Sequence, residues 1–439
     1  MTGDQRGSPG ASLNTPHFDH SGKGADGLSL TAKIALALVA LCAPVFAALT
    51  FELDFTMNPT RSLSLPVLAI ELALIVIARI DGFRFVPALR AMPRGVLIAL
   101  SVWAVGGTLA SVMAANPSPA RIFFAFSLLH VLLAIALWDR FSSSWKAQRR
   151  VFLAALTGSL LVYVAITQVV TAVLYTSTVF NWDQFGVGVV NIRHLGFYGV
   201  ALAGLGMGYV ASRQMQGRWW PGLLVAATGF YFVAWTGGRS PFLSVFVTLF
   251  LLVAIMGPGA RLKVTGALLA VAALVMPVSL VTAPPNPLYG LESIIGRVTP
   301  EAEAPPDQNS VSHRTEIWAD TLEKVIERPV IGHGQSNWSK QVESSRGQHA
   351  HPHNLVMQVL YDWGLVGALA LLALGLMALW RVPRWIAHRR DLALPAIGGI
   401  ACLLVMSMAD GPFFFAFPQF VVAVCVAVLA SLDLEAERG

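Results

Sequence analysis

Residues 354–380 read NLVMQVLYDWGLVGALALLALGLMALW, an apolar run in which Asp362 is the only charged side chain. A run of about 20 predominantly apolar residues is long enough to cross the hydrocarbon core of a bilayer as one helix. The sequence therefore predicts a membrane-spanning helix over this stretch, and the same reasoning extends to the rest of the chain.

Similar apolar runs recur along the 439 residues, of which 55% are hydrophobic and only 12% charged, with a mean hydropathy of +0.64. Such values are typical of a chain that folds in a bilayer. We predict an all-α integral membrane protein with about twelve transmembrane helices, near residues 33–50, 63–80, 95–114, 120–138, 151–174, 196–212, 219–236, 241–257, 263–282, 354–380, 393–409 and 412–431.

The net charge of +6 does not indicate a nucleic-acid partner, because the Lys and Arg residues lie in short clusters between the apolar runs. The three cysteines, Cys42, Cys402 and Cys425, all lie inside apolar runs without paired spacing. Neither a disulfide framework nor a cysteine metal site is expected.

The basic residues instead predict the orientation in the membrane, because cytoplasmic loops retain Lys and Arg. One alternate set of short loops contains sixteen of them, within residues 79–94, 140–150, 213–218, 261–263 and 381–390. The opposite short loops contain only Arg61, Arg121, Arg193 and Arg239. Both termini are therefore expected in the cytoplasm.

The expected organisation has five parts: a disordered cytoplasmic tail (1–30), nine transmembrane helices (31–282), a long periplasmic loop (283–353), three more transmembrane helices (354–432) and a cytoplasmic tail (433–439). Within the long loop, the pattern predicts a helix over Ser312–Arg328, which Ser310 or Ser312 can cap and Pro329 ends. Its apolar stripe suggests that it lies on the membrane surface or packs over the spans; the stripe comprises Ile317, Trp318, Leu322, Val325 and Ile326.

Candidate chemistry begins where the long loop re-enters the membrane, at His353 and Asn354. At helical spacing, Gly364 shares a face with His353 and Gly367 lies close to it, so these glycines would let a helix or a lipid chain approach beneath the imidazole. The alternative to a catalytic function is a structural one, in which Asn354 caps the helix and His353 lies at the membrane interface. The alternation of His349, His351 and His353 is also compatible with a metal site, although no cysteine or acidic cluster lies nearby.

Three arginines on the expected outer side are candidates for binding an anion. Arg239 follows two glycines and precedes Ser240 and Pro241, which predicts a helix start with Ser240 as the cap, and helix starts bind phosphate. Arg314 lies on the apolar edge of the loop helix, and Arg193 lies in a short outer segment. An arginine at this depth can also be a simple interfacial anchor.

The three arginines and His353 share one level, the outer boundary of the membrane. A lipid-linked diphosphate would lie at that depth, with arginines neutralising the charge on the leaving group and a histidine accepting a proton from an attacking hydroxyl.

The chain resembles the O-antigen ligase and polymerase superfamily of bacterial envelope glycosyltransferases along nearly its whole length. The most specific match is the ligase pattern of His353, Asn354, nine residues and then Gly364-x-x-Gly367. The segments 312–318, 332–334 and 238–240 also look like those of the family.

The resemblance implies a metal-independent, inverting transfer of a glycan from undecaprenyl diphosphate to a lipid A-core hydroxyl at the periplasmic face of the inner membrane. It implies that His353 acts as the general base or orients the acceptor. Arg239 and Arg314 would bind the diphosphate and Arg193 would assist, while Asn354, Gly364 and Gly367 would support the motif. No cofactor is required.

Two alternatives remain. An O-antigen or exopolysaccharide polymerase would join lipid-linked repeat units by nearly the same chemistry. A polysaccharide transporter would need ionisable groups deep in its spans or broken helices in matching halves. Glu71 is the clearest acidic residue deep in a span, Asp362 lies only partway in, and no convincing internal repeat is evident.

Overall fold

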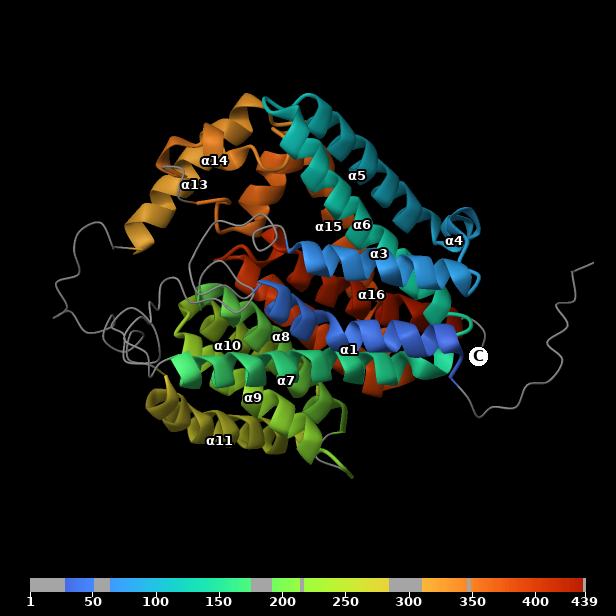
Figure 1. Cartoon of the computed structure of the whole chain (residues 1–439), viewed down its shortest axis with the longest axis vertical. Coiled ribbons are helices and arrows are strands. Elements are labelled where there is room, and N and C mark those ends of the chain that lie inside the picture. The colour runs from blue at the N-terminus through green and yellow to red at the C-terminus, as the bar shows by residue number, and fades with distance from the viewer. Residues whose placement is uncertain are drawn as a thin grey trace, which may run out of the picture.

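The computed structural model describes residues 28–50, 64–174, 192–213, 217–283, 310–345 and 349–436. All regular secondary structure in these ranges is helical, which confirms the all-α class (Figure 1). Most of the expected tail 1–30 and the Pro-rich and acidic part of the long loop, residues 284–309, lie outside the described residues.

The structure contains the following helices, and most of the longer ones coincide with the expected spans to within a few residues. They are α1 (Leu30–Thr50), α3 (Leu65–Ile80), α4 (Phe85–Ala91), α5 (Arg94–Val112), α6 (Pro117–Phe141), η1 (Lys146–Gln148), α7 (Arg149–Leu174), α8 (Ile192–Arg213), α9 (Trp220–Thr236), α10 (Arg239–Ala254), α11 (Pro258–Thr282), α13 (Ser310–Glu327), α14 (Trp338–Gln341), η3 (Glu343–Ser345), α15 (Leu355–Ser407), η4 (Pro412–Phe414) and α16 (Ala416–Ala436).

Among the described residues, eight helices are long and apolar enough to cross a membrane. Three further helices that coincide with expected spans, α3, α9 and α10, have only 16 or 17 residues. The protein is therefore a multi-pass α-helical membrane protein, and the count of twelve spans stays a prediction.

Helix α15 covers two of the expected spans and folds back on itself. Its backbone leaves helical geometry at Gly364 and again at Arg389. The Asn354 amide before its first residue donates to the carbonyl of Met408, just after its last residue, at 3.0 Å. The parts before and after Arg389 therefore run antiparallel, and the two ends of α15 lie side by side.

Helix α8 lies at the centre of the bundle, and 89% of its most apolar window is buried. It packs closely against α9 and the second part of α15 through small residues. A Cβ at Gly204 would lie 2.2 Å from the carbonyl oxygen of Gly398, and a Cβ at Gly206 would lie 2.2 Å from the backbone nitrogen of Ala226. Close helix contact through small residues is how transmembrane helices gain packing energy when lipid surrounds them.

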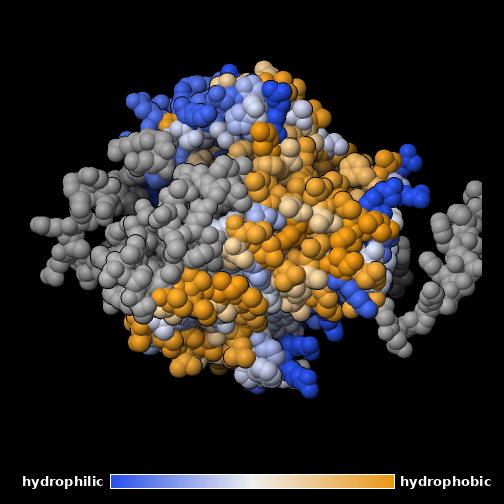
Figure 2. All heavy atoms as spheres, viewed as in Figure 1, coloured by the Kyte–Doolittle hydropathy of each residue, from blue (hydrophilic) through white to orange (hydrophobic). Residues whose placement is uncertain are grey.

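The outer surface matches a bilayer environment. In Figure 2, apolar side chains cover the face of the bundle, while hydrophilic side chains gather over α13 and α14 at the upper left and near α4 at the right. Many large apolar side chains of the spans are exposed, including Phe250, Leu274 and Leu369. In water such a surface would cause association, whereas in a bilayer it contacts lipid.

The helix ends divide into two groups at opposite ends of the bundle. One group, which includes the end of α3, the end of α6 and the break in α15, carries ion pairs of the basic clusters: Arg140 pairs with Asp81 and Asp139, and Arg381 pairs with Asp433 at 2.9 Å. The starts of α8, α10 and α16 and both ends of α15 belong to the other group. Which of the two ends faces the cytoplasm stays a prediction.

A hydrogen-bonded histidine and glutamate lie inside the bundle. The Nδ1 atom of His130 on α6 lies 2.7 Å from a carboxylate oxygen of Glu71 on α3, and both residues are buried. Glu71, the acidic residue expected deep in a span, therefore has a partner, and the pair connects two neighbouring helices.

The loop helix is confirmed as α13, which begins at Ser310 and ends at Glu327, before Pro329. Ile317 and Val325 are buried against Trp338 of α14 and Tyr361 of α15, so α13 packs over the start of α15. Of the rest of the apolar stripe, Trp318 is half-buried, while Leu322 and Ile326 are exposed.

Candidate active site

The turn before α15 carries His353. The residue has φ of 54°, in the left-handed region that few residues other than glycine adopt, and such strain occurs often at functional positions. Asn354 is the N-cap: its side-chain oxygen accepts the N–H of Met357 at 3.1 Å, and its amide donates to Met408. Both functions of the Asn354 side chain therefore hold the turn in place.

His353 lies between a carboxylate and a second imidazole. Its Nδ1 lies 3.3 Å from Oδ1 of Asp410, and its Nε2 lies 3.4 Å from Nδ1 of His349. Because an ionised carboxylate only accepts hydrogen bonds, Nδ1 of His353 carries the proton. In the neutral ring, Nε2 is then the nitrogen that can accept a proton from a substrate.

Asp410 is buried in the loop between α15 and η4. Burial acts to raise its pKa, but the hydrogen bond from His353 and the charge of the same ring when protonated lower the pKa to well below its ordinary value. Its Oδ1 also accepts the N–H of Gly411 at 2.8 Å, and its Oδ2 accepts the hydroxyl of Ser240 at 3.2 Å. Asp410 is therefore a fixed anion.

His351 supports the turn from inside. Burial and the neighbouring His353 hold its pKa well below the ordinary value, so the ring is neutral, and its Nδ1 accepts the backbone N–H of His353 at 3.2 Å. Its ring packs against Phe414 with a centroid distance of 5.3 Å. A Cβ at Gly411 would lie 2.0 Å from the His351 ring, so only glycine fits there.

Arg239 lies at the start of α10, as expected, and its side chain is exposed. The expected cap is wrong: Gly238 is the N-cap, and the hydroxyl of Ser240 donates to Asp410 instead of to the helix backbone. The start of α10 is therefore joined through Asp410 to His353. A helix N-terminus with free amides and an arginine is suited to bind an anion.

Arg314 lies on α13 and is half-buried. One turn further on, the indole N–H of Trp318 donates to the carbonyl of Pro352 at 2.9 Å, which ties α13 to the residue before His353. The backbone of Arg193 lies in the first turn of α8, and its side chain is outside the described part of the chain.

The start of α8 also reaches this site. The ring of His194 lies against Phe415 with a centroid distance of 4.5 Å. The three helices that carry the arginines, α8, α10 and α13, therefore meet at the turn of His353. The direct side-chain contacts described there join His353 to Asp410 and Asp410 to Ser240.

The two motif glycines, Gly364 and Gly367, do not form the shared helix face with His353 that the sequence predicts. His353 precedes the helix and Gly364, with φ of 61°, breaks it, so the prediction that the two share one helix face is wrong. A Cβ at Gly364 would lie 2.4 Å from the backbone of Val330. Gly367 remains helical and packs within its own turn, against Trp363.

The break at Gly364 frees backbone groups that the segment 329–334 then binds. The N–H groups of His333 and Gly334 donate to the carbonyls of Tyr361 and Asp362 at 2.7 and 3.0 Å. In return, the N–H groups of Leu365 and Val366 donate to the carbonyls of Pro329 and Val330, at 2.8 and 3.1 Å. The element that approaches the glycine is thus the periplasmic loop itself.

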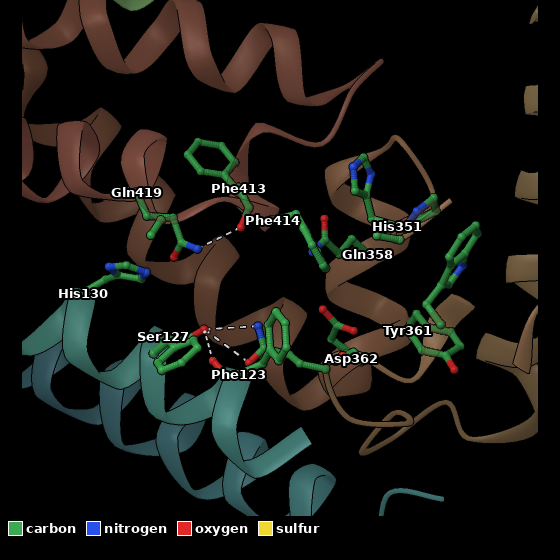
Figure 3. Close-up of a pocket in the computed structure, with 17 residues that line it drawn as sticks. Phe123, Ser127, His130, His351, Gln358, Tyr361, Asp362, Phe413, Phe414 and Gln419 are labelled. Atoms are coloured by element: carbon green, nitrogen blue, oxygen red, sulfur yellow. Dashed lines mark hydrogen bonds between the residues drawn. The ribbon is translucent and has the colours of Figure 1, made fainter. Parts of the chain in front are cut away.

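A polar pocket lies beside the turn, between α6, the first turns of α15, η4 and the start of α16 (Figure 3). His351 and Pro352 form part of its wall, as do Ser127, Gln358, Asp362 and Phe414. Within the described ranges, no three His, Cys, Asp or Glu side chains are placed to hold a metal ion. The three imidazoles at 349, 351 and 353 contact one another and Asp410 instead of converging on one point.

The structure brings the predicted candidates His353, Asn354 and Arg239 to this site; the sequence named His351 only as a possible metal ligand and did not single out Asp410. The available signal was an acidic residue followed by Gly411 and Pro412, in a short outer loop with no other charge.

The fold and the site together define a multi-pass α-helical membrane protein with one histidine–carboxylate site at one end of the bundle, where arginine-bearing helices meet. Comparison with known proteins shows which family this chain resembles. Residues 223–372, about a third of the chain, match the family model described as O-antigen ligase. That range includes Arg239, Arg314, His353, Gly364 and Gly367, and excludes Arg193 and Asp410.

Two curated proteins are similar to parts of the chain. An O-antigen ligase of Pseudomonas aeruginosa is 29% identical over 131 residues, 29% of this chain and 32% of that protein. A Rickettsia conorii protein provisionally named a polysaccharide ligase is 29% identical over 79 residues, 15% of this chain and 19% of that protein. The matches thus span a third or less of those relatives. The resemblance to the O-antigen ligase superfamily is confirmed.

Proposed function

We propose that this protein is a polyprenyl-diphosphate-dependent glycosyltransferase of the O-antigen ligase type. It transfers a glycan from undecaprenyl diphosphate to a hydroxyl of lipid A-core, without a metal, at the periplasmic face of the bacterial inner membrane. The observation that carries the proposal is the connection of His353 through Asp410 to Ser240, beside Arg239 at the start of α10.

In the proposed reaction, the acceptor hydroxyl oxygen attacks the anomeric carbon of the donor glycan from the face opposite the diphosphate. The new C–O bond forms while the bond to the diphosphate oxygen breaks, and that oxygen retains the electron pair, so the configuration inverts. Nε2 of His353 accepts the hydroxyl proton, and Asp410 stabilises the resulting imidazolium. Positioning of two lipid-linked substrates at one membrane level supplies much of the remaining rate.

The arginines act on the leaving group. Negative charge grows on the diphosphate as the anomeric bond breaks, and a guanidinium and free helix amides stabilise that charge. Arg239 and Arg314 are proposed to hold the diphosphate, and Arg193 to assist. Asn354, Gly364 and Gly367 are proposed to maintain the backbone that positions His353.

The test places the purified protein in lipid nanodiscs with undecaprenyl-diphosphate-linked glycan, with and without lipid A-core, and follows product size on gels. A ligase produces glycan-bearing lipid A-core only when that acceptor is present. If the donor glycan lengthens without lipid A-core, the protein is a polymerase. If neither product forms, and the protein instead moves the lipid-linked glycan across the bilayer of sealed vesicles, the transporter alternative holds.

A further inference from the structure

The pocket beside the turn of His353 has a composition different from that of the arginine side of the site. It contains amide, hydroxyl and carboxyl groups from three helices and the segment before α14, among them Ser127, Gln335, Gln358, Asp362 and Gln419. None of its lining residues is an arginine or a lysine, and its one imidazole on α6, His130, is already paired with Glu71. Such a pocket suits an uncharged ligand with several hydroxyls and does not suit a diphosphate.

Aromatic rings complete the pocket, and their polar ends point elsewhere. The hydroxyl of Tyr361 donates to Gln341 at 2.8 Å, and the indole N–H of Trp338 donates to Thr321 at 2.9 Å. Their rings, with Phe123 and Phe414, therefore offer apolar surface to a ligand. Figure 3 shows Phe123, Tyr361 and Phe414 around the pocket. Apolar rings beside a few directed polar groups can contact both the C–H face and the hydroxyls of a sugar.

A layer of rings separates this pocket from the arginine side. His351 contacts both Phe414, which lines the pocket, and Phe415, which packs on His194 and Phe197 of α8. The starts of α8 and α10, with Arg193 and Arg239, lie beyond that layer. His353 directly follows the pocket residues His351 and Pro352, and its ring contacts Asp410 on the arginine side of this layer.

We infer that the pocket binds the sugar ring of the acceptor that carries the attacking hydroxyl, and that the donor diphosphate occupies the opposite side of the turn of His353. The inference rests on the proposed function and adds to it a place for the second substrate. A general base between two compartments can contact a hydroxyl from one and deliver it to an anomeric carbon in the other.

The free space in the pocket accepts only about two water molecules. The hydroxyl-bearing edge of a sugar ring would replace these waters, while the ring itself stays at the mouth between the aromatic side chains. The polar groups are meanwhile held by mutual contacts, with Ser127 and Gln335 bonded to each other at 3.1 Å and Gln419 bonded to the carbonyl of Phe413 at 2.9 Å. Those contacts can be exchanged for hydrogen bonds to the ligand.

The experiment compares wild type with Gln358→Met and Ser127→Ala, which remove polar groups of the pocket without adding bulk. Thr228→Ala is the matched control, because Thr228 lies on α9, outside the pocket, and its hydroxyl donates an exposed hydrogen bond to the carbonyl of Leu224. Steady-state transfer is measured against lipid A-core and against the lipid-linked donor. We expect the KM for the acceptor to rise about 10-fold in the two pocket variants, with the KM for the donor unchanged.

A second readout does not depend on turnover. Hydrogen–deuterium exchange of the nanodisc protein is followed with delipidated core oligosaccharide as the probe. We expect protection of the segments 331–345 and 349–361 in wild type and in Thr228→Ala, and its loss in Gln358→Met. Thermal unfolding of each variant reports whether the fold is intact.

A raised KM for the donor in the pocket variants, or an unchanged KM for both substrates together with no protection by the oligosaccharide, would overturn the subsite. Failure of the proposed function looks different: wild type then transfers no glycan at all, or His353→Ala transfers it normally. In that case the protection experiment still decides whether the pocket binds sugar.

Discussion

Asp410 orients His353, and this contact determines which ring nitrogen can act as a base. Its carboxylate accepts from Nδ1 of His353, from the N–H of Gly411 and from the hydroxyl of Ser240. Three donors on one buried carboxylate fix its position and keep it ionised. The proton on Nδ1 then leaves Nε2 of His353 able to accept a proton from a substrate hydroxyl.

The first prediction concerns Asp410→Asn, which keeps the shape of the side chain and removes its charge. We expect kcat for glycan transfer to fall about 100-fold or more, because the imidazolium loses its counter-ion and the ring loses its fixed tautomer. Steady-state transfer in nanodiscs measures the effect. Ser240→Ala removes only one of the three donors to Asp410 and should lower kcat by less than about 10-fold. A kcat for Asp410→Asn equal to that of wild type would show that Asp410 does not position the base.

At this scale, the sequence predicts residues whose signal is local. His353 and Asn354 are adjacent, and the cap that Asn354 forms is readable from spacing alone. Asp410 follows His353 by 57 residues, and its function depends on the return of α15 to its own start. No periodicity in the sequence reports that contact.

At the scale of elements, α15 is where prediction and structure differ most. The apolar runs 354–380 and 393–409 were both located correctly, because length and hydropathy determine them. The break at Gly364 was not predicted, because an isolated glycine in a membrane helix has the same sequence signal whether it is helical or not. What determines the break is the segment 329–334, which forms four backbone hydrogen bonds with the two sides of Gly364.

The second prediction tests that break. In Gly364→Ala, a Cβ would overlap the backbone of Val330 at a residue with φ of 61°, so we expect a loss on the order of 2–4 kcal/mol in unfolding free energy. Gly375→Ala is the matched control, because Gly375 lies in the same helix and a Cβ added there would meet no atom within 4 Å. The control should change stability by less than about 1 kcal/mol. Equal unfolding midpoints for the two variants in detergent would contradict the account.

The loop helix shows the same division between local and distant information. Helix α13 begins and ends close to the expected residues because Pro329 and the apolar spacing are local signals. Its packing partners, Trp338 and Tyr361, lie further along the chain and could not be assigned from the pattern. The predicted cap of α10 is wrong for the same reason. The hydroxyl of Ser240 donates to Asp410, which lies far away in the sequence, and not to the helix backbone.

At the scale of the whole molecule, the helix ends form two groups, and the candidate site lies at the end opposite the basic clusters. The third prediction tests the orientation. With the three buried native cysteines replaced, Ala350→Cys and Ala147→Cys place a thiol at exposed positions of the two opposite ends. In intact cells with a permeabilised outer membrane, an impermeant maleimide should label position 350 and not position 147. Labelling of position 147 alone would place the site in the cytoplasm.

The fourth prediction concerns metal removal. His349, His351 and His353 are engaged with one another and with Asp410, and do not converge on a common point. We therefore expect full transfer activity after exhaustive treatment with EDTA, measured with the same nanodisc assay. Loss of activity with EDTA and its restoration by zinc would contradict this expectation and support a metal site at these histidines.

The most direct test of the central claim is glycan transfer by His353→Ala in nanodiscs that contain the lipid-linked donor and lipid A-core. We predict a fall in kcat of about 100-fold to 10,000-fold, with the thermal stability and the KM for the donor close to those of wild type. Transfer by the variant within about twofold of wild type would contradict the assignment of His353 as the general base.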